Sequence, residues 1–347
     1  MRILAVGDTY MARQYFERAF EALEPDHDIA YGQIDTQSAF VPRSESERRL
    51  REYQGSPDEL VDRLPGVEVL VVHAAPVSDE VLAAAPSLRL LCCARGGPVN
   101  VDLEAASARS IPVVNTPGKN AEAVADQTLA FLIMLARGFP KAQAFLLTGG
   151  SVGASAFEGA EFFGHDLGGH VLGLVGFGHV GRRVADRAIS FGMRIVVYDP
   201  YLDGDAVDGV ERVETLDELL ALADFVSVHA RATSENENLF GADEFAAMRP
   251  GAYFVNTARE TLVDEAALDE ALATGHLSGA ALDVVRPRNG GAPHLLLRHP
   301  NVVITPHIGG ATYETMLRGA RMIADEIARF DSGLPLLHVV NRAAAEA

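Results

Sequence analysis

The chain has 347 residues and predicts about two domains, at roughly 150 residues for each. Hydrophobic residues make up 48% and charged residues 22%, a globular composition that excludes wholesale disorder and fibrous folds. The net charge of −19 repels other polyanions, so we expect neither nucleic acid nor an anionic membrane as a partner.

The sequence shows no apolar run that predicts export or membrane insertion. The first residues, Met1–Asp8, form too short an apolar run for a signal peptide, and no window approaches the roughly 18 to 20 apolar residues of a membrane span. We therefore expect a soluble cytoplasmic protein. Cys92 and Cys93 are adjacent, so in a strand they would point to opposite faces, and we expect neither a disulfide nor a metal site.

Short apolar runs alternate with helical patterns along almost the whole chain. In chain order, strands are expected at 3–6, 67–72, 88–93, 111–114, 171–175, 194–198, 224–229, 252–256, 279–283 and 301–304. Helices are expected up to about Leu23, over 120–137 with Asn120 as the cap, and over 311–330, with short helices and loops in the polar segment 35–66. This alternation is typical of parallel strands joined by crossover helices, so the fold class is α/β.

A dinucleotide-binding fingerprint follows the strand expected at 171–175. The hexapeptide Gly176–Gly181 (GFGHVG) opens a helical stretch, and the next strand ends in Asp199, 23 residues after Gly176. In this motif the first glycine permits a tight turn, the second lets the backbone approach the pyrophosphate, and the third lets helix and strand pack closely. These are Gly176, Gly178 and Gly181.

The fingerprint also predicts which dinucleotide binds. Asp199 would accept hydrogen bonds from the ribose hydroxyls and would repel a 2′-phosphate, so we expect NAD rather than NADP. His179 and Val180 occupy variable positions of the motif, and we expect them to contribute backbone groups at the helix N-terminus.

Beyond the fingerprint, the chain resembles the NAD-dependent D-2-hydroxyacid dehydrogenases, the phosphoglycerate dehydrogenase-like family, from Leu88 to Phe330. The motifs that match in order are IPVVNTP at 111–117, NTAR at 256–259, LVD at 262–264, ALDV at 281–284 and TPHIGG at 305–310. The resemblance implies two doubly wound parallel-sheet domains and a homodimer. A flavodoxin-like substrate domain would comprise 1–119 and 309–347, and a Rossmann NAD-binding domain would comprise 120–308.

The resemblance further implies which residues carry the chemistry. Hydride transfer to a 2-oxo acid needs a cation that holds the carboxylate and polarises the carbonyl, and a proton donor for the developing alkoxide. Arg259 matches the family's arginine, and His307 matches its acid/base, a task that suits imidazole because it titrates near neutrality. The substrate-carboxylate loop would contain Gly96 and Gly97, and the cofactor would also contact Thr257, Ala258 and Asp283. The other histidines, His73 among them, are expected to be structural.

One family position carries an unexpected residue. The family orients its histidine with a glutamate five residues after the aspartate that matches Asp283, and this chain has Arg288 there. A carboxylate beside a histidine holds its tautomer and favours the charged form, whereas an arginine favours the neutral form. Either His307 works without a carboxylate partner, or Arg288 or Arg286, together with Arg95, binds a second anionic group on the substrate. The alternative is that these arginines face solvent.

Two smaller departures accompany it. Glu260 stands where the family usually has glycine, and we expect it to pair with a neighbouring arginine rather than to supply the missing carboxylate. Arg231 stands where the family commonly has proline near the cofactor, and it would either add a phosphate contact or reach solvent.

The sequence therefore predicts an NAD-dependent oxidoreductase that interconverts a small 2-oxo acid, phospho- and phosphono-acids included, and its D-2-hydroxy acid. A second hypothesis is an NAD(H)-sensing, corepressor-like binding protein with impaired catalysis. The lost glutamate favours it, and the retained Arg259 and His307 oppose it. Formate-type hydride abstraction is weaker still, because that chemistry needs no proton-donating acid.

Overall fold

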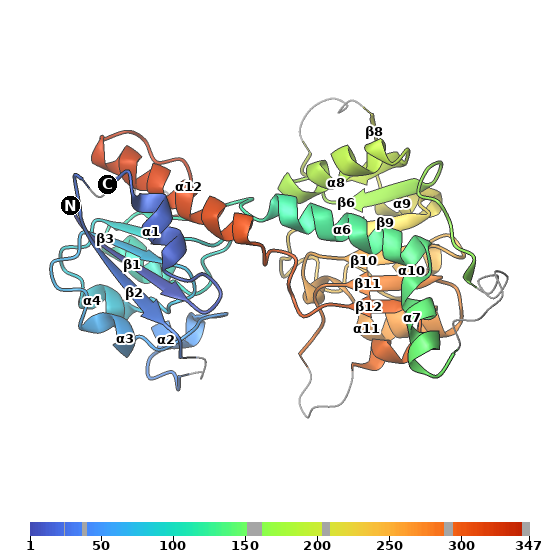
Figure 1. Cartoon of the computed structure of the whole chain (residues 1–347), viewed down its shortest axis with the longest axis horizontal. Helices are drawn as coiled ribbons and strands as arrows, with labels where there is room; N and C mark the ends of the chain where they lie inside the picture. The colour runs from blue at the N-terminus through green and yellow to red at the C-terminus, as the bar shows by residue number, and fades with distance from the viewer. Residues whose placement is uncertain (24, 37–39, 151–161, 203–208, 288–293, 342–347) are drawn as a thin grey trace. The chain divides into compact units, whose positions relative to one another are not determined.

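The computed structural model describes residues 1–23, 25–36, 40–150, 162–202, 209–287 and 294–341. The chain forms two compact units (Figure 1). Unit 1 comprises Met1–Lys119 and Ala311–Ala347, and unit 2 comprises Asn120–Gly310.

Unit 1 contains a five-stranded parallel sheet with the order β2-β1-β3-β4-β5, the order found in flavodoxin. The central strands are β-branched and leucine-rich runs that are buried on both faces, as the sequence predicts for parallel strands. The strands are β1 (Arg2–Asp8), β2 (Asp28–Ile34), β3 (Val69–Val72), β4 (Leu90–Cys93) and β5 (Val113–Val114).

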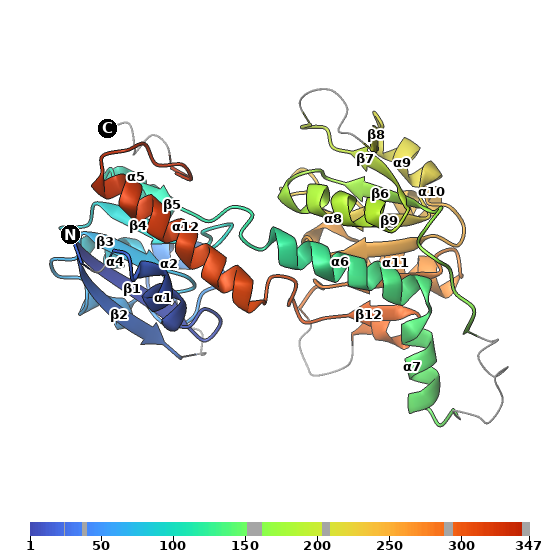
Figure 2. The ribbon, with the colours of Figure 1, turned by 45° about the horizontal axis from the view of Figure 1, so that its top comes forward.

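Helices cover both faces of this sheet. On one face α1 and α12 lie side by side and pack on alternate strand residues that include Cys92 (Figure 2). The other face, which includes Cys93, packs against α3, α4 and α5. The two thiols are free and lie on opposite faces, as predicted. The helices are α1 (Gln14–Phe20), α2 (Glu45–Arg49), α3 (Asp58–Val61), α4 (Asp79–Ala83), α5 (Leu103–Ala108) and α12 (Tyr313–Asp331).

Unit 2 contains a seven-stranded parallel sheet with the order β12-β11-β10-β9-β6-β7-β8. Counted from β6, this is the Rossmann order 3-2-1-4-5-6 with one further strand at the β12 edge. The strands are β6 (Val171–Val175), β7 (Arg194–Tyr198), β8 (Val210–Arg212), β9 (Phe225–Val228), β10 (Tyr253–Asn256), β11 (Gly279–Leu282) and β12 (Val302–Ile304).

The unit 2 sheet is also covered on both faces. One face packs against α6 and α8, which run side by side (Figure 2), and the other against α9, α10 and α11. Glu122 of α6 forms ion pairs with Arg183 and Arg187 of α8, which ties these two helices together. The helices are α6 (Ala121–Ala136), α7 (Phe139–Leu147), α8 (His179–Ser190), α9 (Leu216–Leu222), α10 (Ala242–Ala247) and α11 (Glu265–Ala273), with short 3-10 turns η2 (Glu260–Leu262) and η3 (Leu295–Arg298).

The α/β prediction is confirmed, and three details differ from it. Two edge strands, β2 and β8, were not predicted, because most of their residues are only partly buried and their apolar patterns are weak. Asn120 makes no side-chain cap for α6, since its backbone is not extended as a capping residue requires (φ −99°, ψ 3°). The helix predicted over 311–330 begins instead at Tyr313, after Thr312 has capped it.

No single helix among the described residues is long and apolar enough to cross a membrane. Helices α6 and α7 have the length and composition only when taken together, and they are bent by 66° at the break between them.

Candidate functional site

The predicted motifs of unit 2 lie at the carboxyl ends of five neighbouring strands of its sheet. The strands β6, β9, β10, β11 and β12 are adjacent and parallel, so their carboxyl ends meet at the same edge. The turns that follow them begin at Gly176, His229, Thr257, Asp283 and Thr305. In open parallel sheets, ligands bind outside this edge, where the strand order reverses, and here that point lies between β6 and β9.

Three glycines shape the turn from β6 into α8, each for a different reason. Gly176 has φ +96°, and a Cβ there would lie 2.6 Å from the amide nitrogen of Ala230. A Cβ on Gly181 would collide with the carbonyl oxygen of Gly176, so only glycine lets α8 pack this closely. Around Gly178 a Cβ would meet nothing within 4 Å, which leaves this part of the loop open.

The N-terminus of α8 is free to receive an anion. Gly178 precedes the helix and no side chain caps it, so the amides of the first turn are not used by a capping side chain. Asp199, just after β7, accepts hydrogen bonds from the amides of Phe177 (2.7 Å) and Tyr201 (2.9 Å). Its carboxylate therefore fixes the glycine turn directly. A free helix N-terminus, an open loop at Gly178 and an acid at the next strand end together fit a dinucleotide.

The turn after β10 presents Arg259. Asn256 holds this turn through its side chain, accepting from the amide of Ala258 and donating to the carbonyl of Arg259, both at 2.9 Å. Arg259 is exposed, and its guanidinium donates to the carbonyl of Ala258. Within the described residues no carboxylate forms an ion pair with Arg259, and no arginine forms one with Glu260, so the pairing predicted for Glu260 is not observed.

The turn after β12 presents His307 in a conformation that other residues must hold. Its φ is +55°, in the left-handed region that histidine adopts only occasionally. The buried carboxylate of Asp283 accepts hydrogen bonds from the amides of Ile308 (2.9 Å) and Gly309 (2.7 Å) and from the side chain of Thr305 (2.6 Å). Gln127 of α6 donates to the same carboxylate at 2.9 Å. We call these contacts the Asp283 clasp.

The clasp holds the backbone of the turn but leaves the His307 ring exposed. Among the described residues the imidazole has no hydrogen-bond or ion-pair partner, which fits the absence of the family's glutamate. Arg288 lies outside the described residues. Arg286 is described, and its guanidinium bonds to Asn238 (2.7 Å) and pairs with Glu237 (3.8 Å), so it is engaged within unit 2.

His229 follows β9 and bonds to the hydroxyl of Ser227 through Nε2 at 3.0 Å. Burial holds the pKa of His229 below its ordinary value, so the ring is neutral at pH 7. This agrees with the structural role expected for it. Arg231, two residues on, is exposed, and the described residues give its side chain no partner.

In unit 1 the predicted substrate loop follows β4. Gly96 and Gly97 are exposed, and in the described part of the chain their amides have no acceptor. Asn115 and Thr116, which follow β5, hold the loop by donating to the carbonyls of Gly96 (2.7 Å) and Arg95 (2.9 Å). The side chain of Arg95 does not reach outward as a free cation, because it forms an ion pair and a backbone hydrogen bond with Glu52.

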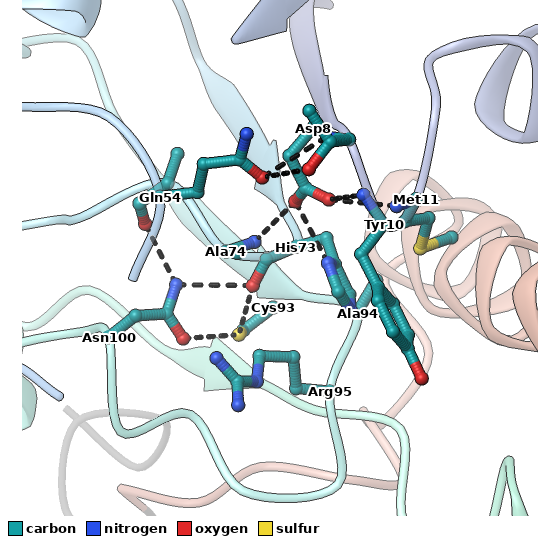
Figure 3. Close-up of polar contacts among 12 residues, drawn as sticks. Asp8, Tyr10, Met11, Gln54, His73, Ala74, Cys93, Ala94, Arg95 and Asn100 are labelled. Atoms are coloured by element: carbon teal, nitrogen blue, oxygen red, sulfur yellow. Dashed lines mark hydrogen bonds and ion pairs between the residues drawn. The ribbon is translucent and has the colours of Figure 1, made fainter. Parts of the chain in front are cut away.

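A second buried cluster, not predicted, lies where the unit 1 strand order reverses, between β1 and β3 (Figure 3). Asp8 accepts hydrogen bonds from Nδ1 of His73 and from the amides of Ala74 and Met11, each at 2.8 Å. The ring of Tyr10 stacks on His73 with an interplanar angle of 4°. Burial lowers the pKa of His73, so at neutral pH the ring donates Nδ1–H to the carboxylate. The cluster ties the ends of β1 and β3 together.

Comparison with known proteins assigns this arrangement to a family. The model of the D-isomer specific 2-hydroxyacid dehydrogenase NAD binding domain matches residues 129–309. The chain belongs to this family. Unit 2 is therefore its NAD-binding domain, and NAD is the cofactor for which its glycine turn and Asp199 are suited.

Individual relatives agree with that assignment. The chain is 37% identical to the D-3-phosphoglycerate dehydrogenase of Archaeoglobus fulgidus over 289 residues, 82% of this chain and 54% of that protein. The chain thus spans about half the length of the curated relatives it matches.

Among solved structures, the TT0316 protein of Thermus thermophilus is 34% identical with a TM-score of 0.75, over 98% of this chain and 100% of that one. An NAD-dependent formate dehydrogenase of Staphylococcus aureus, solved in complex with NAD, is 28% identical with a TM-score of 0.73, over 98% of each chain.

Proposed function

We propose that this protein is an NAD-dependent dehydrogenase that interconverts a small 2-oxo acid and its D-2-hydroxy acid. The observation that carries the proposal is the Asp283 clasp, which holds His307 in a left-handed turn at the same sheet edge as the free Arg259 and the glycine turn. Strained backbone conformations of this kind are concentrated at active sites and ligand-binding sites.

The residues divide the chemistry between them. A bound NADH supplies a hydride for the carbonyl carbon. The fork of Arg259 holds the carboxylate and polarises the carbonyl, so that the electron pair moves onto the carbonyl oxygen. Nε2 or Nδ1 of His307 donates the proton that this oxygen receives, and the neutral ring accepts it back when the alcohol is oxidised.

The same proposal assigns the remaining site residues. The first-turn amides of α8, among them those of His179 and Val180, receive the diphosphate, and Asp199 receives the adenosine ribose. Thr257, Ala258 and Asp283 belong to the nicotinamide side of the site. For Asp283 the four protein donors on its carboxylate favour a positioning role over direct contact with the cofactor.

Two further groups of residues are candidates for binding the substrate. The free amides of Gly96 and Gly97 suit a carboxylate, and Arg288 remains a candidate for a second anionic group. Arg95 suits that role less well, because Glu52 already engages its guanidinium. Several curated relatives are named for a phosphorylated acid, 3-phosphoglycerate, which is a reason to include such acids in any substrate panel.

We also propose that the protein is a cytoplasmic homodimer paired through unit 2. Helix α7 has no buried residue, yet it exposes Phe139, Phe145, Leu146 and Leu147, the last with 77% of its surface accessible. Exposed apolar side chains gathered on one helix are typical of an interface. Leu147→Asp should convert a dimer to a monomer in light scattering, and a wild-type monomer would reject this part of the proposal.

The activity is tested by following NADH consumption with a panel of mono- and dianionic 2-oxo acids and determining the chirality of the product. Turnover that yields the D-2-hydroxy acid supports the proposal. Tight NADH binding without turnover of any acid would favour the NAD(H)-sensing hypothesis instead.

A further inference from the structure

The lysines of this chain are unusual in number and in place. The sequence contains two, Lys119 and Lys141, and arginine supplies the remaining 27 of the 29 basic residues. Lys141 lies on the exposed face of α7. Lys119 ends unit 1 and is 6% exposed, and among the described residues it is the single lysine or arginine that is buried.

The ammonium of Lys119 makes fewer polar contacts than a buried charge usually does. Nζ donates to the carbonyl of Ala94 at 2.6 Å, which uses one of its three donors. No carboxylate in the described part of the chain lies within ion-pair distance of it, although the chain is strongly acidic. The buried carboxylates differ in this respect, since Asp8, Asp102 and Glu326 each accept several hydrogen bonds.

The fold makes room for this side chain. Gly319 of α12 faces the lysine stem, and a Cβ there would lie 2.8 Å from Cδ of Lys119. On its other side, Lys119 contacts Ala94, the residue immediately before the Arg95–Gly97 loop. The segment from Asn115 to Lys119 also holds that loop through Asn115 and Thr116. Lys119 therefore lies against the substrate loop proposed above.

A second polar group in the same segment also lacks a partner. The hydroxyl of Thr116 is fully buried and has no hydrogen-bond partner among the described residues. Buried polar groups are nearly always satisfied, so two incomplete groups within four residues point to a polar ligand. Because one of them is a cation without a counter-ion, the missing ligand is an anion.

We propose that Lys119 is the counter-charge for an anionic group of the substrate, a carboxylate or a phosphate, and so determines which acids the enzyme accepts. This inference rests on the proposed dehydrogenase function. The sequence predicted Arg95 as a cation that binds an anionic group of the substrate, and we assign that role to Lys119 instead. Arg95 is paired with Glu52, whereas no carboxylate in the described residues pairs with Lys119.

The electrostatics of the free protein agree with this assignment. Burial lowers the pKa of Lys119 to about 8. Cys93 of β4 and Asp8 at the end of β1 act to raise it, whereas Arg95 acts to lower it. From α12, Gly319 faces the lysine stem, and the guanidinium of Arg318 donates to the backbone carbonyl of Lys119. An anion bound beside Nζ would favour the charged form and move its titration to higher pH.

The first arm of the test is kinetic. Lys119→Met keeps the stem and removes the charge, so KM should rise roughly 10- to 100-fold for any acid whose anionic group Lys119 holds, while kcat stays within a few-fold. A rise for 2-oxoglutarate and phosphohydroxypyruvate but not pyruvate would assign Lys119 to a second anionic group. A rise for all three would assign it to the 2-carboxylate. KM values within twofold of wild type for every acid would overturn the proposal.

Stability separates this role from a structural one. Removing an uncompensated buried charge should leave the melting temperature of Lys119→Met unchanged or raise it. A lower melting temperature with unchanged KM would mean that Lys119 only supports the fold. Gly319→Ala provides a second variant that crowds the lysine stem and keeps its charge, and it should also raise KM.

The second arm does not depend on turnover. With ε-carbon-labelled lysine the protein gives two lysine signals, which Lys141→Met assigns, and Lys141 serves as the internal reference. With NAD⁺ and pyruvate or 2-oxoglutarate, the Lys119 titration should move to higher pH and that of Lys141 should not. If the wild type turns over no acid but Lys119 responds, the dehydrogenase proposal fails and the anion site stands. If turnover is normal and Lys119 responds to neither acid, the anion site fails.

Discussion

Arg259 in unit 2 and Arg95 in unit 1 follow parallel strands at the carboxyl edges of their sheets, yet their surroundings differ. Arg259 is exposed on a turn that Asn256 holds, and no carboxylate in the described residues pairs with it. Arg95 is mostly buried and is engaged by Glu52 through both its side chain and its backbone carbonyl. A paired arginine stabilises a loop, whereas an unpaired cation at a sheet edge is available to a ligand. Residue type alone does not separate the two roles.

The largest expected effect tests that contrast directly. Arg259→Met should lower kcat/KM for 2-oxo acid reduction by roughly 1,000-fold, because it removes the group that polarises the carbonyl. Arg95→Met is the matched control and should lower it less than about 10-fold, since an ion pair with a half-exposed carboxylate contributes little. Steady-state kinetics on both variants checks this. Equal losses of kcat/KM would contradict the distinction between a ligand-binding Arg259 and a loop-stabilising Arg95.

The Asp283 clasp should give the next largest effect on catalysis. Thr305→Val removes the hydroxyl that donates to the Asp283 carboxylate and accepts from Gln127. It should lower kcat roughly 10-fold by loosening the His307 turn, with a stability loss of about 1 kcal/mol. Kinetics combined with urea unfolding measures both quantities. Unchanged kcat in a destabilised variant would mean that the clasp serves the fold and not His307.

The buried Asp8–His73 pair predicts how unit 1 responds to acid. Burial alone would raise the pKa of Asp8, but the hydrogen bonds from His73, Met11 and Ala74 outweigh it and hold the pKa below its ordinary value. A depressed carboxyl pKa contributes stability that is present above the unfolded value, about 4, and is lost as the pH falls through the folded value. Burial also lowers the pKa of His73, so protonation of the unfolded chain weakens the fold below about pH 6.5.

Asp8→Asn should therefore be about 2 kcal/mol less stable than wild type at pH 7, with a gap that narrows below about pH 4. Urea unfolding of both proteins across this range is the measurement. A gap that stays constant down to acid pH would show that Asp8 acts through packing and not through its charge.

The smallest expected effect compares two helix starts. Thr215 caps α9 in a complete capping box with Glu218, so Thr215→Ala should cost about 1 kcal/mol. Asn120 makes no cap for α6, so Asn120→Ala should cost less than about 0.5 kcal/mol in unfolding free energy. A loss at Asn120 equal to that at Thr215 would contradict the cap assignment.

The comparison also explains what the sequence could predict. The glycine turn, Arg259 and His307 lie in contiguous motifs next to strongly apolar strands, so local pattern was enough to predict that they follow strands of one sheet. The clasp was not predicted, because Gln127 and Asp283 lie 156 residues apart and meet only once the sheet and α6 have packed. Asp283 itself was assigned to the cofactor, and its engagement by four protein donors could not be read from its motif.

Unit 1 was harder to predict from the sequence, because its edge strand has a weak pattern and its polar contacts also join residues that are far apart in the chain. The first four residues of its edge strand β2 alternate between exposed and half-buried, which gives a weak apolar signal. The pairing of Asp8 with His73 and of Arg95 with Glu52 joins residues 65 and 43 positions apart. The rarity of lysine is visible in the sequence, since a chain with two lysines is unusual. The functional role proposed for Lys119 depends on its burial and on its lack of a carboxylate partner among the described residues, which only the structure shows.

The central claim is hydride transfer to a 2-oxo acid at the unit 2 edge, and the most direct test uses NADH deuterated at the transferable position of the nicotinamide. Incubation with the preferred 2-oxo acid should give a D-2-hydroxy acid that carries deuterium on C2, and His307→Gln should abolish this transfer while NADH binding persists. NADH binding by the wild type without deuterium in any product would contradict the account and leave a dinucleotide-binding protein in its place.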